Sequence, residues 1–393
     1  MYNIYDVLRS GLRALIYSVF GKRGRLMKII CNGYDLSEAV NKVIKAVGAK
    51  TVSPILEGIK IETVDGGIKL TATDMELAIE KVIAAEVRAE GAVVVPGRLF
   101  AEFVKKIDAE RVELSLFEDK KMKMRYRGCE SEFNCLPEDE YPVIKKLDDA
   151  KYFTFLGKNL RDLINKVSFC VSTDESRPIL KGVSLDLESN TVTAVATDGY
   201  RLARCVKNVE SSDGNMTAVV PARSLNEIAR LIEDDEQPVT VALQKNYLAV
   251  DFQHTCVTSR LLEGSYINYR QIIPQRFETR ATLAKDAFSA SLERAILLTR
   301  SDRNNLVKFD MHENMMDITS DSEAGRVDEH LDIKLEGKDL TIAFNARYFT
   351  ELIKYIGSDC MTISFNDAIQ PCIVTPADST EDLLYLILPV RMA

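Results

Sequence analysis

The chain has 393 residues, of which 46% are hydrophobic and 28% charged, a globular balance that excludes disorder, collagen and coiled coil as descriptions of the whole chain. Its 51 Lys and Arg residues against 59 Asp and Glu give a net charge of -8, which by itself argues against a polyanionic partner. Because the 8 cysteines form no C-x-x-C pair and only 3 histidines are present, we predict no disulfide framework, zinc site or histidine triad, and a reducing cytosol fits best.

Residues 1–26 differ in composition from the rest. They carry one acid, Asp6, against five Lys or Arg residues. Their longest uncharged apolar stretch, 14–20, is much shorter than the roughly 20 residues that span a bilayer. A targeting or membrane-surface helix is one interpretation, with one apolar face formed by Leu8, Leu12, Leu15, Ile16 and Val19. The preferred interpretation is an appendage before Met27 that is not part of the fold.

From Met27 onward, apolar residues at i, i+3, i+4 and i+7 predict amphipathic helices, and runs of alternating hydrophobicity between them predict short strands. The predicted helices span 36–50, 97–107, 158–172, 222–232, 284–303 and 345–356.

Three phrases recur in the same order along the chain, which indicates an internal repeat. The helix phrase VVPGRLF returns as VVPARSL and AFNARYF, so that Arg98, Arg223 and Arg347 lie 125 and 124 residues apart. The phrase TATD at 71–74 returns as VATD at 195–198 and, more weakly, as ITSD ending at Asp321. A third phrase, SPILEGIKIE, returns as RPILKGVSLDL.

This period predicts an α+β protein of three domains, each with two helices on one face of antiparallel sheets. We call these domains repeat 1 (27–147), repeat 2 (151–276) and repeat 3 (279–393), preceded by the extension 1–26.

Charge is segregated between the helices and the rest of the chain. The six predicted helices carry a net charge of +9 and the extension +4, so the remainder carries -21. Six basic helices favour a common phosphate-backbone partner, although lysines on solvated helix faces would give the same count. Without a base-reading motif, contact with nucleic acid would be independent of sequence.

From Met27 to Ala393 the chain resembles the bacterial DNA polymerase III beta subunits, the sliding clamps. The resemblance is carried by SPIL, TATDMELAI, AVATDGYRLA, the Y-x-N-Y-R-x-x-P phrase at 266–274, FNARY and the ending LPVRM. It implies a non-catalytic processivity factor with the DNA clamp fold, in which two chains join head to tail as a six-domain ring around duplex DNA. It also implies that the dimer interface includes Phe133, Leu297 and Leu298.

Domain size agrees with six domains in the ring. A domain of about 120 residues is roughly 35 Å across, so three leave an opening of about 5 Å and six leave about 35 Å. A duplex of roughly 20 Å passes only through the larger ring. The candidate DNA-facing residues are Lys50, Arg98 and Arg223, with Lys42, Lys45 and Arg347 behind them.

The resemblance further implies cytoplasmic partners: double-stranded DNA, a second copy of the chain, the polymerase III alpha subunit, the clamp loader, other clamp-binding polymerases, ligase and mismatch-repair proteins. These proteins would insert a short, partly apolar peptide into a groove between repeats 2 and 3. Carried over residue by residue, the groove comprises Arg177, Leu180, Thr197, Gly199, Tyr200, Arg201, Leu202, Ile267, Ile272, Asn345, Tyr348, Ile369, Pro371, Leu386, Ile387, Leu388, Pro389, Val390 and Arg391. Tyr200 stands where many relatives carry histidine and Gln271 where some carry arginine, which leaves the peptide preference open.

Nothing in the sequence predicts a catalytic residue, a metal or a cofactor. Asp74, Asp198 and Asp321 are better interpreted as turn carboxylates that bond their own backbone, since the repeat places them in separate domains. Phosphate-binding, metalloprotease and hydrolase motifs are absent. Two alternatives remain: a metal-dependent enzyme that modifies nucleic acid, and a monomeric peptide-binding scaffold.

Overall fold

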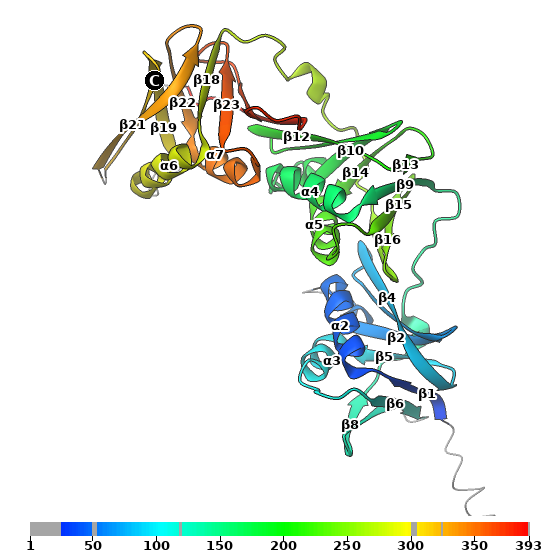
Figure 1. The fold of residues 1–393 in the computed structure, drawn as a ribbon. Coiled ribbons are helices and arrows are strands. Elements are labelled where there is room, and N and C mark those ends of the chain that lie inside the picture. Colours follow the sequence, from blue (N-terminus) through cyan, green and yellow to red (C-terminus); the bar gives the residue numbers. More distant parts are fainter. Residues whose placement is uncertain (1–24, 49–52, 118–119, 300–304, 324, 392–393) are drawn as a thin grey trace, which may run out of the picture. The chain divides into compact units, whose positions relative to one another are not determined.

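The computed structural model describes residues 25–48, 53–117, 120–299, 305–323 and 325–391. They form two compact units (Figure 1). The first unit combines the described residues up to Lys146 with Ala249–Ser259, and the second combines Leu147–Leu248 with the described residues from Arg260 onward. Within these ranges, no helix has the length and apolar character needed to cross a membrane.

The first unit contains two antiparallel sheets that share one long strand. The first sheet has the order β5-β2-β3-β4, with β2 (Gly58–Val64), β3 (Gly67–Thr73), β4 (Leu77–Ala89) and β5 (Ala92–Pro96). The second half of β4 continues into the order β4-β1-β6-β7-β8, with β1 (Arg25–Cys31), β6 (Val112–Phe117), β7 (Lys121–Tyr126) and β8 (Cys129–Asn134). β17 (Thr255–Arg260) pairs with the first half of β4.

Two helices, α2 (Gly33–Val43) and α3 (Gly97–Val104), pack against each other in this unit, and α2 covers β3 and β4. α2 begins three residues before the predicted start because the Asn32 side chain accepts the backbone N–H groups of Tyr34 and Asp35 and so caps the helix. β1 begins at Arg25, two residues before the predicted boundary at Met27.

The second unit is built on one 12-stranded antiparallel sheet. Repeat 2 contributes β10 (Gly182–Glu188), β11 (Thr191–Thr197), β12 (Arg201–Asn208) and β14 (Met216–Pro221). Repeat 3 contributes β18 (Thr279–Ala284), β19 (Leu306–His312), β20 (Met315–Ser322), β21 (Gly325–Glu336), β22 (Leu340–Asn345), β23 (Cys360–Phe365), β24 (Cys372–Pro376) and β25 (Leu383–Ile387). The order is β14-β10-β11-β12-β25-β24-β23-β18-β21-β20-β19-β22, so backbone pairing of β12 with β25 joins the two repeats.

The remaining strands of repeat 2 are β9 (Lys151–Leu156), β13 (Ser211–Ser212), β15 (Pro238–Gln244) and β16 (Tyr247–Phe252). Helices again pack in pairs, α4 (Gly157–Val167) with α5 (Ala222–Leu231) and α6 (Lys285–Thr299) with α7 (Ala346–Leu352). The six predicted helices are therefore confirmed among the described residues, and short 3-10 turns at Ile44–Ala46, Ser168–Cys170 and Ile353–Tyr355 form the ends predicted as helix.

The turn after TATD has the same geometry in repeats 1 and 2. Asp74 Oδ1 accepts the backbone N–H groups of Glu76 and Leu77, at 3.1 and 2.9 Å, and Asp198 Oδ1 accepts those of Tyr200 and Arg201, at 2.9 and 3.0 Å. Both carboxylates thus serve the turn, as predicted.

Repeat 3 departs from this alignment. The hairpin pairs Thr73 with Ala78 in repeat 1, Thr197 with Leu202 in repeat 2 and Asp321 with Arg326 in repeat 3. Asp321 is therefore the structural counterpart of the threonines, and the next residue occupies the position of Asp74 and Asp198. The alignment of Asp321 with Asp74 and Asp198 is therefore wrong by one position.

Met75 adopts a left-handed backbone conformation (φ 77°) where repeat 2 has Gly199 (φ 93°). A side chain costs roughly 1–2 kcal/mol in this conformation, whereas glycine adopts it freely. Because Met75 is 60% exposed, Met75→Gly removes strain and little packing. Glycine also raises the conformational entropy of the unfolded chain, which offsets part of this benefit. We therefore expect the free energy of unfolding to rise by about 0.5–1 kcal/mol, with a small rise in the melting temperature of the first unit. Gly199→Ala is the matched control and should lower stability; an unchanged or lower melting temperature for Met75→Gly would contradict the strain argument.

Candidate functional site

A cavity of about 690 Å³ lies in the second unit where repeat 2 meets repeat 3. Its walls come from the segment before the 3-10 turn Pro178–Lys181, from the turn between β11 and β12, and from the start of α7. The lining residues are Val171, Ser172, Thr173, Asp174, Arg177, Asp198, Gly199, Tyr200, Arg201, Asn305, Asn345, Arg347, Tyr348 and Glu351.

Arg201 holds the two repeats together at the base of this cavity. Its guanidinium donates to Asp198 Oδ2 at 3.0 Å, to the carbonyl oxygen of Phe169 at 3.2 Å and to the Glu351 carboxylate. The Tyr348 ring lies against the same guanidinium, with 4.8 Å between Arg201 Cζ and the ring centroid. With its donors committed to these partners, Arg201 is a fixed part of the wall.

Glu351 joins Arg201 to a second cation, Arg347, whose Nε lies 2.7 Å from Glu351 Oε1. Burial opposes ionisation of Glu351, but hydrogen bonds from Arg347 and Arg201 outweigh it and hold the pKa of the carboxyl below its usual value. The carboxylate stays charged at neutral pH, and it keeps both arginines in place.

An apolar cluster adjoins the cavity through Leu202, which is buried with Tyr269, Ile373, Leu386 and Val195. The partly buried hydrophobic residues packed against it include Ile267 and Leu388. Backbone hydrogen bonds fix the chain end here, from Leu388 N to Tyr200 O at 2.9 Å and from Val390 N to Ala343 O at 2.8 Å.

The predicted groove residues fall into three groups. Six line the cavity: Arg177, Gly199, Tyr200, Arg201, Asn345 and Tyr348. Five are buried and do not line it: Leu180, Thr197, Leu202, Leu386 and Ile387. The others lie outside the cavity lining, and among them Ile272 and Ile369 are exposed.

The sequence reasoning missed Glu351, which lies one helical turn after Arg347 and could have been found from this i, i+4 spacing. It also missed Asn305, for which the sequence offers no signal.

The candidate DNA-facing residues differ in their surroundings. Arg98 and Arg223 are exposed at the starts of α3 and α5, and Lys45 is exposed beside α2. Lys42 is only 7% exposed, and its ammonium lies 2.8 Å from Glu38. Arg347 is exposed but lines the cavity described above. Lys50 lies outside the described residues.

The candidate interface residues lie at two places. Phe133 is buried on β8, where its ring meets those of Phe100 and Phe103 edge-on at 5.4 and 5.2 Å. Leu297 and Leu298 lie near the end of α6, where Leu297 is 59% exposed and Leu298 is half-buried. In the described part of the chain, no three His, Cys, Asp or Glu side chains gather closely enough to hold a metal ion.

Three family models match the chain in succession. They describe the N-terminal, central and C-terminal domains of the DNA polymerase III beta subunit, and they match residues 27–145, 155–268 and 270–391. The beta sliding clamp of Halalkalibacterium halodurans is 33% identical over 366 residues, which cover 90% of this chain and 96% of the relative. That of Bacillus subtilis is 32% identical over 378 residues, which cover 93% and 100%.

Solved structures agree with the sequence relatives. The crystal structure of the DNA polymerase sliding clamp from Bacillus subtilis matches with a TM-score of 0.90 and 31% identity, over 93% of this chain and 100% of that one. That of the DNA polymerase III beta subunit from Thermotoga maritima matches with a TM-score of 0.87 and 28% identity, over the same shares.

Proposed function

The chain belongs to the DNA polymerase III beta subunit family, the beta sliding clamps, and we propose that two copies close head to tail into a ring that encircles duplex DNA in the cytoplasm. The ring would tether the replicative polymerase and other replication and repair proteins through the cavity between repeats 2 and 3, without catalysis of its own. The observation that carries this proposal is a pair of strand edges, one at each end of the repeat array, that have no partner among the described residues.

Two equivalent edges are already filled within the chain. On β4, Leu77 lies opposite Ser259 and Ala78 opposite Thr258 of β17. On β12, Arg201 lies opposite Ile387 and Leu202 opposite Leu386 of β25. In both cases the last strand of one repeat pairs with the long strand of the repeat before it.

The third long strand, β21, has the corresponding edge open. Its first half pairs with β20 on one side, from Gly325 opposite Ser322 to Asp332 opposite Met315, and no described strand lies on the other side. The last strand of repeat 1, β8, likewise pairs only with β7 in the described part of the chain. Open edges attract further strands, and a second copy supplies the matching edge in each case.

The internal repeat also predicts the register between the copies. Leu136 N donates to Val94 O, and the equivalent bond runs from Leu262 N to Val219 O, which aligns β8 with β17. In this alignment Glu132 corresponds to Thr258 and Phe133 to Ser259. Within the chain, Thr258 lies opposite Ala78, and the counterpart of Ala78 in repeat 3 is Arg326. We therefore expect Glu132 of one copy to lie opposite Arg326 of the other.

One residue along the same register, Phe133 would lie opposite Gly325. A Cβ on Gly325 would be 3.6 Å from Leu298 Cδ1, so Leu298 lies directly beside this position. This register supports an interface role for the three residues that the resemblance assigns to it. The largely buried Phe133 would present its remaining surface to Gly325 and Leu298, and the exposed Leu297 would extend the apolar contact.

The DNA would contact exposed basic residues on the helices, chiefly Arg98 and Arg223. Reversing the charge with Arg98→Glu replaces one screened attraction with a repulsion, so we expect retention on circular DNA to weaken severalfold, with the largest effect at low salt. The control is Lys245→Glu, which reverses an exposed charge in the turn between β15 and β16, outside the helices. If both variants are retained as long as the unaltered chain, Arg98 does not face DNA.

A retention assay tests the proposal as a whole. A topological ring stays on nicked circular DNA and slides off the same DNA once it is linearised, whereas a protein held by surface charge leaves both at the same rate. We therefore expect a long half-life on the circle and a short one on the linear molecule, after loading by an ATP-dependent clamp loader. Equal half-lives would refute the ring.

A further inference from the structure

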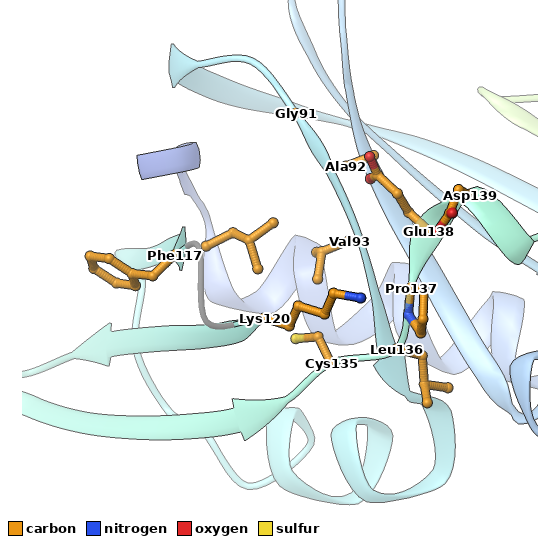
Figure 2. A pocket seen from close by; sticks show the side chains of 11 residues that line it. Gly91, Ala92, Val93, Phe117, Lys120, Cys135, Leu136, Pro137, Glu138 and Asp139 are labelled. Carbon is orange, nitrogen blue, oxygen red and sulfur yellow. The ribbon is translucent and has the colours of Figure 1, made fainter. Parts of the chain in front are cut away.

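A second cavity, of about 360 Å³, lies in the first unit (Figure 2). Its walls are largely apolar and include Ala92, Val93, Leu116 and Leu136. Lys120 extends across it, and Cys135 lies beside Lys120. The DNA, interface and groove roles proposed above do not use this cavity.

The chain enters the first unit beside this cavity. β1 begins at Arg25, which pairs with Phe117 of β6, and Met27 pairs with Leu116. Both β6 residues line the cavity. Residues 1–24 therefore join the fold one strand spacing, about 5 Å, from the cavity wall.

The sequence of this segment suits an apolar cavity so close by. Ile16, Val19 and Phe20 are spaced for one helical face and lie within about 30 Å of extended chain from Arg25. Gly21 and Gly24 lie between them and β1 and permit a sharp reversal of the chain. The segment can thus fold back over its own entry point.

Charge also favours this occupant. Residues 1–24 contain four Lys or Arg residues against Asp6, a net charge of +3. The cavity rim includes Glu138 and Asp139, both exposed, and Glu140 follows them in the same 3-10 turn. Lys120 is the one cation in the lining, and its ammonium can donate to carbonyl oxygens of an entering segment.

We propose that residues 1–24 dock back onto repeat 1, with Ile16, Val19 and Phe20 filling the cavity between β5, β6 and the end of β8 while Lys22 and Arg23 lie against the acidic rim. The segment is then a built-in ligand of the first unit, in place of a small molecule or a partner protein.

Because the chain contains no tryptophan, Phe20→Trp provides a single fluorescent reporter in the full chain. Docking predicts blue-shifted emission and severalfold slower quenching by acrylamide than in the same chain with Ala92→Phe, which fills the cavity. Replacing Glu138 and Asp139 with lysine should weaken docking by about tenfold, since two screened ion pairs turn repulsive. The Glu138 and Asp139 variant changes only exposed side chains, so it still tests docking if Ala92→Phe fails to fold.

Site-resolved alkylation gives an independent measurement. Burial raises the pKa of the Cys135 thiol to about 11, so its reaction with iodoacetamide is slow and sensitive to access. Removing residues 2–24 should accelerate modification of Cys135 severalfold. Cys129, exposed at the start of β8, is the internal control and should react equally in both chains.

Two results would overturn the proposal: water-exposed emission from Trp at position 20, or identical Cys135 rates with and without the segment. Protection of Cys135 that rises with protein concentration in the truncated chain would also overturn it, because a second copy would then occupy the cavity.

Discussion

Replacing Glu132 with proline should convert the dimer into a monomer while the chain stays folded. Arg127 and Gly128 both have positive φ angles, 44° and 80°, as in a two-residue type I′ turn between β7 and β8. Such a turn is closed by a hydrogen-bonded pair, Tyr126 with Cys129, so alternate residues direct their backbone groups to opposite sides. Glu132 therefore directs its N–H away from β7, toward the open edge.

Proline at this position removes a hydrogen bond to the second copy and places its ring against the incoming strand, but it leaves the ladder with β7 intact. A carbonyl oxygen left without its donor costs about 1–3 kcal/mol, and the ring clash adds to this, so we expect the dissociation constant to rise about tenfold to a hundredfold or more. Sedimentation at micromolar concentration should then report the 44.1 kDa monomer in place of twice that mass.

The matched control is Glu132→Ala, which removes the same side chain and its ion pair with Lys121 but keeps the N–H. This variant should remain dimeric, with at most a small rise in the dissociation constant of the dimer. The register has its own test: with Cys129 replaced by serine, cysteines at positions 132 and 326 should cross-link two chains, and cysteines at 132 and 328 should not. A proline variant that stays dimeric, or the reverse cross-linking pattern, would contradict the pairing of β8 with β21.

Deleting residues 388–393 should abolish binding of partner peptides and leave the dimer intact. The deletion starts after β25, so the sheet that joins repeats 2 and 3 keeps its pairing with β12. It removes Leu388, which packs on the apolar cluster and bonds to the Tyr200 carbonyl at the cavity mouth. A short peptide depends on a few apolar anchors, so we expect affinity to fall at least about a hundredfold.

Fluorescence anisotropy with a labelled polymerase-derived peptide measures this loss, and sedimentation of the same sample checks the dimer. Lys245→Ala, which changes only an exposed side chain in the turn between β15 and β16 outside the groove, is the control and should bind nearly as well as the unaltered chain. Retained peptide binding after the deletion would show that the anchor site lies elsewhere.

The α+β class, the six helices and the internal repeat followed from the sequence because they depend on periodicity over many residues. The one-residue error at Asp321 has a definite cause: the letters ITSD match TATD, but the β20–β21 hairpin pairs Asp321 with Arg326, and no letter pattern in this degraded copy marks that register. Helix ends were missed where a local cap decides them, as at Asn32.

Single side chains were harder to predict than elements. Lys42 falls on the basic helix as predicted, yet its stem is buried and its ammonium pairs with Glu38 one turn earlier. Arg347 matches Arg98 and Arg223 in the repeat, but in the second unit it meets Glu351 and the cavity. The position of an arginine within its repeat does not show which other repeat it faces. For Arg347 that contact is the cavity with repeat 2, and it distinguishes this residue from Arg98 and Arg223.

The unbroken pairing of β12 with β25 also bears on how such a ring would open. Backbone hydrogen bonds join repeats 2 and 3 within one chain, and the Arg201 cluster reinforces them from beside the sheet. A clamp loader that opened the ring at this point would have to break the sheet shared by repeats 2 and 3, which makes the second unit one compact body. Repeats 1 and 2 are likewise joined by the pairing of β4 with β17. In the proposed ring, a duplex would therefore enter at the interface between the two copies, where only a few strand residues and one apolar contact would have to separate.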